Sequence, residues 1–125
     1  MNANKERLVC ILACMGLLTV SGCKSYWIDA NVENQTGRPI HELEVDYPSA
    51  SFGTNSLAPG AAFHYRFQVR DSGAVRVNYV SVDGKTVHVD GIELDEQVQG
   101  QLTIRLLPGE KVDFLPSWKA SRSEK

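Results

Sequence analysis

Hydrophobic and polar residues alternate along most of the chain after residue 25. In "FHYRFQVR", residues 63–70, an aromatic or aliphatic side chain occupies every second position, with a polar one between. Successive side chains of a β-strand point to opposite faces of its sheet, so this alternation predicts strands with one buried face. Six segments follow the pattern and are expected to be strands: 26–33, 41–47, 63–70, 74–80, 86–91 and 101–107. A weaker seventh strand is expected at 50–52 or at 92–94.

Turn-forming residues stand between these segments, in "NQTGRP", "YPSAS", "LAPGA", "RDSGA", "VDGK" and "PGEK". Short strands at this spacing, separated by glycine, proline, asparagine and aspartate, are typical of a sandwich or small barrel. We therefore expect an all-β protein with a single small antiparallel β-sandwich of six to seven strands. In "NQT" we interpret Asn34 as a turn residue that bonds its own backbone, with Gly37 at positive φ, rather than as a glycosylation acceptor.

The pairing of the hairpin at 74–91 can be predicted to register. A two-residue turn at Asp83 and Gly84 would place the valines of the two strands on opposite faces of the sheet. A three-residue loop, with Gly84 left-handed as a G1 bulge, places them on one face. The expected pairs are then Tyr79 with Val87, Val77 with Val89, Arg76 with Asp90 and Asn78 with His88. We predict this second register because it places the apolar residues of both strands on the core face and pairs Arg76 with Asp90 on the outer face.

The N-terminal segment carries Lys5 and Arg7 ahead of an apolar run at 8–20. This run of about 13 residues is too short for a bilayer span of about 20 residues, but it has the length of the apolar region of a secretory signal. The run ends in Val20, Ser21, Gly22 and Cys23, which resemble the lipobox of bacterial lipoproteins. The resemblance implies cleavage between Gly22 and Cys23, a thioether from Cys23 to diacylglycerol, and acylation of the new amino terminus.

The chain is accordingly expected to divide into four parts. These are a cleaved lipoprotein signal peptide at 1–22, a lipidated anchor and short linker at 23–25, the β-sandwich at 26–108 and a polar C-terminal tail at 109–125. Lys24 stands where an aspartate would retain such a protein in the inner membrane, so the resemblance implies the outer membrane. Cys10 and Cys14 leave with the signal and Cys23 is lipidated, so no disulfide is expected.

The charge of the chain argues against nucleic-acid binding. The whole chain has 13 basic and 15 acidic side chains, and removal of Lys5, Glu6 and Arg7 leaves 11 and 14, a net charge of −3. Proteins that bind nucleic acid concentrate positive charge on one surface. We therefore expect the partners to be the membrane, through the N-terminal lipid, and another envelope protein.

Three histidines follow the lipobox, and two of them raise the question of a metal site. His64, His88 and Asp90 are predicted to face outward, with His88 and Asp90 two residues apart on one strand. A metal requires ligands that converge from several directions, but nothing in the sequence makes the strands of His64 and His88 neighbours, and exposed strand faces commonly carry such residues. We therefore expect no metal and no cofactor. His41 is in phase with Leu43 and is expected to cap the edge of the core.

Charged rows follow two of the predicted strands. Glu42, Glu44 and Asp46 lie along one strand face, and Arg66, Gln68 and Arg70 lie along another. Opposite charges suit cross-strand pairs where strands are neighbours. A calcium site needs six to eight oxygens from several directions, whereas alternate side chains of a flat strand diverge. We interpret these rows as a solvated surface.

Motifs for catalysis do not occur in the sequence. There is no G-x-S-x-G elbow, no H-E-x-x-H, no phosphate-binding loop and no dinucleotide fingerprint. We therefore expect no enzymatic activity and name no catalytic residue.

The C-terminal stretch "PGEKVDFLPSWKASRSEK" changes character after residue 107 and ends in charged residues and serines. Phe114, Leu115 and Trp118 are its apolar exceptions. Two interpretations stay open for these three residues: they fold back over an open end of the sandwich, or they form a short docking motif for a partner.

The part after Cys23 resembles the small immunoglobulin-like or transthyretin-like β-sandwich domains of bacterial envelope proteins. The resemblance rests on strand number, alternation and the opening "N-x-T-G-x-P-I" at 34–40. Two functions are compatible with it. The first is a lipid-anchored, non-catalytic protein-interaction module of the cell envelope. The alternative is a small-ligand or metal-binding envelope lipoprotein that uses His64, His88 and Asp90.

Overall fold

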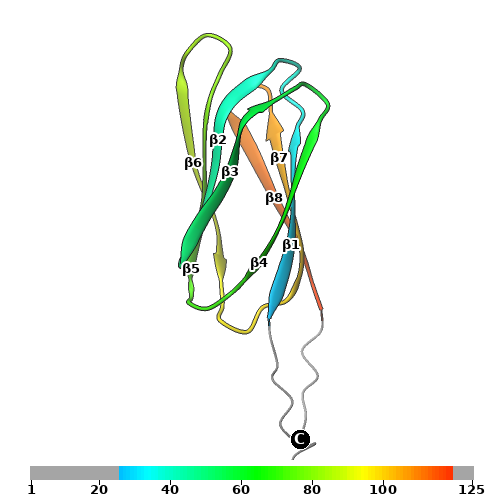
Figure 1. The fold of residues 1–125 in the computed structure, drawn as a ribbon, viewed down its shortest axis with the longest axis vertical. Coiled ribbons are helices and arrows are strands. Elements are labelled where there is room, and N and C mark those ends of the chain that lie inside the picture. The colour runs from blue at the N-terminus through cyan, green and yellow to red at the C-terminus, as the bar shows by residue number, and fades with distance from the viewer. Residues whose placement is uncertain (1–25, 120–125) are drawn as a thin grey trace, which may run out of the picture.

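Eight β-strands form two four-stranded sheets in the computed structural model, which describes residues 26–119 (Figure 1). The strands are β1 (Trp27–Asn34), β2 (Ile40–Tyr47), β3 (Ala50–Leu57), β4 (Ala62–Gln68), β5 (Gly73–Val80), β6 (Thr86–Leu94), β7 (Gly100–Leu107) and β8 (Lys111–Trp118). One sheet has the order β4-β1-β7-β8 and the other the order β3-β2-β5-β6. All neighbours are antiparallel except β1 and β7, which are parallel. The all-β prediction is confirmed.

The predicted number of strands, six to seven, was too low because two edge strands carry weak patterns. β3 is eight residues long, but only Phe52 and Leu57 of it are buried. Its sequence, "ASFGTNSL", therefore lacks the alternation of a half-buried strand. The other weak candidate, 92–94, is the end of β6 rather than a separate strand.

The eighth strand lies in the stretch expected to be a polar tail. β8 pairs with β7 along its whole length, from Gly100 opposite Trp118 to Leu107 opposite Lys111. Val112, Phe114 and Trp118 are partly buried and pack against the core. The sandwich therefore extends to Trp118 rather than ending at 108, and Pro116 is accommodated because β8 is an edge strand.

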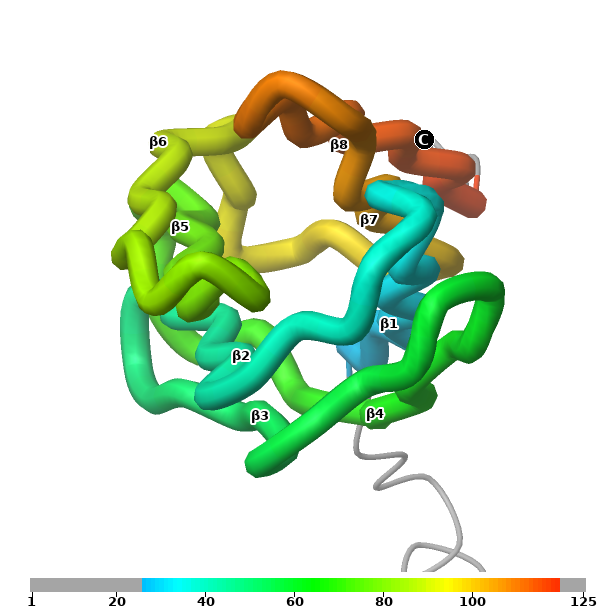
Figure 2. Tube along the Cα trace, turned by 90° about the horizontal axis from the view of Figure 1, so that it is seen from above, coloured from blue at the N-terminus to red at the C-terminus, as the bar shows by residue number. Residues whose placement is uncertain are grey.

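The core lies between the two sheets. Seen from above in Figure 2, the eight strands surround one central region. Buried aliphatic and aromatic side chains fill it: Ile28, Ala30, Val32, Ile40, Leu43, Val45, Phe52, Leu57, Phe67, Val69, Val75, Val77, Tyr79, Val87, Leu94, Leu102, Ile104 and Leu106. Aromatic rings close the side where β3 faces β4, with Tyr47 stacked on Phe67 at 4.2 Å and Phe52 stacked on Tyr65 at 4.5 Å between ring centroids.

The hairpin of β5 and β6 has the register predicted from its sequence. Tyr79 lies opposite Val87, Val77 opposite Val89, Arg76 opposite Asp90 and Asn78 opposite His88. Gly84 has a φ of +79°, and its N–H donates to the Ser81 carbonyl at 2.9 Å. The three-residue loop with a left-handed glycine is confirmed, because it alone brings the apolar residues of both strands to the core.

The prediction for His41 was wrong because β2 contains a bulge. The register of β2 against β5 shifts between His41 and Glu44, and Glu42 has a φ of +51°. Ile40 and Leu43 are both buried as a result, while His41 is exposed. The extra residue changes the phase of the alternation, so His41 leaves the core face.

The turn expected at Asn34 is confirmed. The side-chain oxygen of Asn34 accepts from the backbone N–H of Thr36 at 3.1 Å and from its hydroxyl at 2.7 Å. Gly37 has the expected positive φ, +81°. Asn34 is fully buried, which suits a structural turn residue and leaves no room for a glycan.

The strands give the sandwich two distinct ends (Figure 1). We call the end where β1 begins and β8 finishes the terminal end; it also carries the connections 48–49, 69–72 and 95–99. The connections 35–39, 58–61, 81–85 and 108–110 lie at the opposite end, which we call the hairpin end.

Candidate functional site

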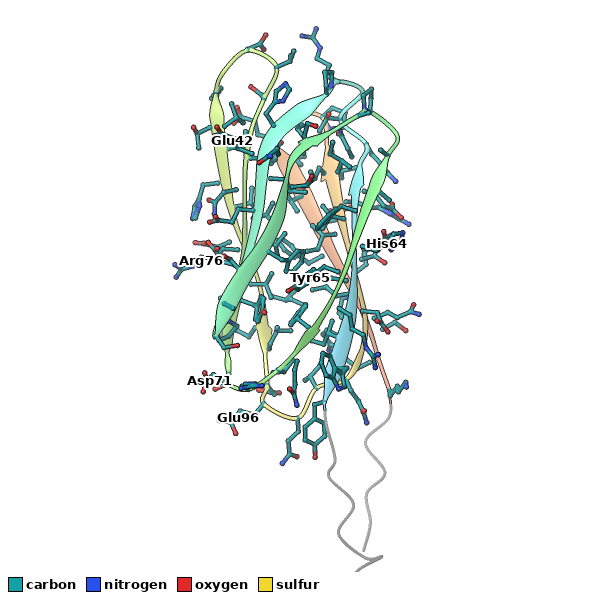
Figure 3. The ribbon with its side chains drawn as sticks, in the orientation of Figure 1. Glu42, His64, Tyr65, Asp71, Arg76 and Glu96 are labelled. Atoms are coloured by element: carbon teal, nitrogen blue, oxygen red, sulfur yellow. The ribbon has the colours of Figure 1, made fainter. Side chains whose placement is uncertain are left out.

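The three residues considered for a metal site do not come together. His64 lies on β4 of one sheet, whereas His88 and Asp90 lie on β6 of the other. Figure 3 shows His64 on the side of the molecule opposite Arg76, whose cross-strand partner is Asp90. Within residues 26–119, no three His, Cys, Asp or Glu side chains are arranged to hold a metal ion.

His88 and Asp90 instead belong to a polar network on the outer face of their sheet. His88 Nε2 lies 3.2 Å from Asp90 Oδ1, and its other ring nitrogen is hydrogen-bonded to the Asn78 side chain. Arg76 contacts Asp90 at 3.4 Å, and the Asn78 amide donates to Asp46 at 3.2 Å. The network runs across β2, β5 and β6, with Arg76 and Asp90 exposed and the Asn78–Asp46 bond partly buried.

The charged rows find different partners from one another. β4 and the acidic strand β2 lie in different sheets, so Arg66 does not pair with the carboxylates of β2. It pairs instead with Asp29 on the neighbouring strand β1, at 3.6 Å. On β2, a hydrogen bond with Asp46 and the charge of that carboxylate raise the pKa of Glu44 above its ordinary 4.5. Two like charges on one strand face oppose ionisation of both at once.

The three apolar residues near the C-terminus are divided between the two faces of β8. Phe114 packs inward, with its ring against Gly91 of β6, and Trp118 is half-buried on the same face. Leu115 points outward and is 41% exposed. Of the three, Leu115 alone is presented to solvent as a docking residue would be.

The residues of the proposed lipid anchor, Gly22 and Cys23, lie outside the described residues 26–119. Residues 26–119 contain no helix with the length and apolar character needed to cross a membrane.

A hollow of about 340 Å³ lies at the hairpin end, and we call it the end hollow. Its lining comes from the β1–β2 connection, the β5–β6 hairpin and the β7–β8 turn. Ile40, Tyr79 and Val87, each at most 4% exposed, provide its apolar lining. Four charged residues also line it: Arg38, Asp83, Lys85 and Glu110.

The charges of the end hollow are arranged as two ion pairs. Arg38 lies 3.9 Å from Asp83, and Lys85 Nζ lies 2.5 Å from the Glu110 carboxylate. The hydrogen bond and charge of Glu110 raise the pKa of Lys85, so this ammonium stays protonated. Burial, and then the charge of Glu110, raise the pKa of Tyr79. The phenol therefore stays neutral below pH 10 and has a hydrogen-bond donor to offer.

The backbone at Glu110 adopts a conformation that normally favours glycine. Its φ is +62°, directly after Gly109 at +78°. Left-handed conformations of non-glycine residues are uncommon and cluster at functional sites. The sequence predicts a turn at "PGEK" but not the end hollow, because three connections far apart in the chain form the hollow. The one local signal of this site in the sequence was Glu110, a non-glycine residue directly after Pro108 and Gly109.

Comparisons with known proteins inform the fold alone. No protein-family model matches the chain, and no curated protein matches its sequence. The NMR structure of a protein from Eubacterium rectale is similar, with a TM-score of 0.51 and 14% identity over 83% of this chain and 97% of that one. At this identity the likeness shows that the two chains share an arrangement of strands.

Proposed function

We propose that the protein is a lipid-anchored, non-catalytic interaction module of the bacterial cell envelope, held in the outer membrane. The lipobox-like residues Val20 to Cys23 and the lysine that follows them support the anchor and its location. The domain itself is proposed to be immunoglobulin-like, in keeping with its two facing sheets.

The observation that carries the proposal is the position of β1 relative to the end hollow. Tyr26 is three residues after Cys23, and an extended chain advances at most about 3.6 Å per residue. A lipid on Cys23 would therefore hold the terminal end within about 11 Å of the membrane surface. The eight-residue strands would carry the end hollow about 26 Å further out.

The terminal end carries groups that suit a position near lipid headgroups. Trp27 is partly exposed, and the Arg66 guanidinium lies over its ring at 4.8 Å from the centroid. Aromatic and basic side chains are common at membrane interfaces. In this orientation the hairpin end faces away from the membrane and is free to meet an envelope protein.

Replacement of Cys23 tests the anchor. We expect the full chain to incorporate an alkyne-labelled palmitate in a bacterial host and to fractionate with the outer membrane. Cys23→Ser should lose the label and accumulate with its signal uncleaved. Normal labelling and processing of this variant would contradict the lipid anchor.

Site-specific photocrosslinking tests the interaction module. A crosslinking amino acid at Val82, exposed at the hairpin end, should capture one defined envelope protein in intact cells. The same amino acid at Glu96, exposed at the terminal end, is the matched control (Figure 3). Equal capture from both positions, or capture that survives Cys23→Ser, would argue against a membrane-oriented module.

The second candidate function is a small-ligand-binding envelope lipoprotein, and the end hollow favours it. Its metal-binding form has less support, because His64 lies in the other sheet from His88 and Asp90. Thermal stabilisation by zinc, copper or calcium that disappears in His88→Ala would favour the metal form. Unchanged melting with all three ions would exclude it.

A further inference from the structure

Glu110 has a side chain at a position where the backbone favours glycine, with a φ of +62°. In the neighbouring hairpin the comparable left-handed position is Gly84, at a φ of +79°. Glycine adopts this conformation without a steric cost, whereas a residue with a Cβ does not. Residues that keep a side chain at such a cost are concentrated at functional sites.

Stability alone does not explain the choice of glutamate. Glu110 pairs with Lys85, but the two side chains are 47% and 66% exposed. Ion pairs as exposed as this one add little to stability, because water and salt screen them. The pair is better understood as a feature of the end hollow, which both residues line.

Tyr79 supplies a hydrogen-bond donor to the same hollow. It is 3% exposed and lines the hollow, and the side-chain hydrogen bonds formed among residues 26–119 include none to its hydroxyl. The hydroxyl oxygen is not one of the buried atoms that lack a partner among residues 26–119, so it reaches solvent and is free to donate to a ligand. Ile40 and Val87 beside it offer an apolar surface.

We propose that the end hollow binds a small zwitterion with an apolar side chain, an amino acid or a dipeptide. The ligand ammonium contacts Glu110, its carboxylate contacts Lys85, and its side chain lies against Ile40, Tyr79 and Val87. Two cations and two anions line the hollow, so a ligand with both charges matches it better than one with a single charge. A volume of about 340 Å³ is at the small end of ligand pockets.

The Lys85–Glu110 pair does not have to break when the ligand binds. An ammonium has three donors and a carboxylate has about four acceptor sites, so each group can keep its partner and also contact the ligand. This proposal deepens the second candidate function and does not depend on the lipid anchor. The labelling and crosslinking experiments with Cys23→Ser test the anchor separately.

Titration of the ¹⁵N-labelled full chain in detergent tests the proposal by NMR. L-leucine or leucyl-leucine should give saturable shifts confined to the amides around the end hollow, at 36–40, 79–87 and 107–110. Whichever of the two binds more tightly identifies the ligand as a free amino acid or as a peptide. 4-Methylpentanoate and isoamylamine, which are leucine without its ammonium and without its carboxylate, should bind at least about tenfold more weakly, as expected for loss of a charge-assisted contact. No saturation by either zwitterion, or equal binding of the single-charge probes, would overturn the proposal.

Glu110→Gly is the decisive variant, because glycine adopts the same backbone conformation and the change removes the side chain with its carboxylate. It should weaken binding of the better zwitterion at least about tenfold without lowering the denaturant midpoint. Glu96→Gln, which removes one exposed carboxylate at the terminal end, should leave binding unchanged. Lys85→Met is a second test, because it removes the positive charge that contacts the ligand carboxylate. It should also weaken binding of the zwitterion. Unchanged binding in both Glu110→Gly and Lys85→Met would refute the proposed site.

Discussion

Asn34 shows how a single polar side chain holds the hairpin end together. It is the one fully buried polar residue among 26–119, and its side chain makes four hydrogen bonds. Its amide donates to the Arg38 carbonyl at 2.8 Å and to the Leu57 carbonyl at 2.9 Å. Asn34 thereby joins the β1–β2 connection to the end of β3.

We predict that Asn34→Ala destabilises the domain by about 2–4 kcal/mol, because it leaves backbone groups of Thr36, Arg38 and Leu57 without their partner. Chemical denaturation monitored by tryptophan fluorescence measures the effect. Gln35→Ala is a matched control, since Gln35 is an exposed amide one residue away. A loss below about 1 kcal/mol for Asn34→Ala would mean that water replaces the four bonds.

Glu44 makes the stability of the domain depend on pH. Asp46 raises the pKa of Glu44 above 4.5, so the folded chain binds this proton more tightly than the unfolded chain. The resulting contribution to stability is present below pH 4.5 and is lost as the pH rises through the folded pKa. We expect Asp46→Asn to lower the pKa of Glu44, because it removes the neighbouring negative charge. A ¹³C NMR titration of the side-chain carboxyl groups checks this, and an unchanged Glu44 titration would assign the shift to another cause.

At the scale of elements, the contact of β6 with β8 closes one side of the sandwich. The Phe114 ring lies directly on Gly91, where an added Cβ would come within 2.4 Å of ring atoms. Gly91 is needed for this close approach and not for its φ, which lies outside the left-handed region. A glycine in a strand interior is often explained by such an approach.

A double-mutant cycle tests this contact. We predict that Gly91→Ala alone costs about 1–3 kcal/mol, the usual range for an overpacked contact. In a Phe114→Ala background the same change should cost much less, since the ring is absent. Denaturant midpoints and slopes of the four proteins give the coupling energy. Additive effects would show that the added methyl group disturbs β6 in some other way.

At the scale of the whole molecule, β8 is an integral part of the sandwich rather than an appendage. Removing it would uncover β7 and the partly buried Val112, Phe114 and Trp118 contacts. Each large apolar side chain contributes about 1.5–3 kcal/mol when buried, against a total stability of about 5–15 kcal/mol for a small domain. The loss of one edge strand is therefore comparable to the stability of the fold.

We predict that a chain ending after Glu110 is unfolded, whereas a chain ending after Lys119 folds. The second chain keeps the whole β7–β8 pairing and the hydrogen bond from the Lys119 N–H to the Gln99 carbonyl at 2.8 Å. Far-ultraviolet circular dichroism and thermal melting distinguish the two. A cooperative transition in the shorter chain would show that seven strands suffice.

Local pattern was enough to predict the fold class, the six strongest strands and two turns. Alternation reports which face of a strand is buried, and the turn at Asn34 and the left-handed Gly84 depend on residues close in sequence. The hairpin of β5 and β6 could be predicted to register for the same reason, since its loop and its core face allow one pairing.

Strand order, the two weak edge strands and the end hollow were decided by the tertiary structure. β3 and β8 are strands because neighbours offer backbone hydrogen bonds, not because their own side chains alternate strongly. The separation of His64 from His88 depends on which sheet each strand joins, and local sequence does not encode that choice. The end hollow assembles Tyr79, Lys85 and Glu110 from separate strands and turns, so only long-range pairing brings these charges and this hydroxyl together.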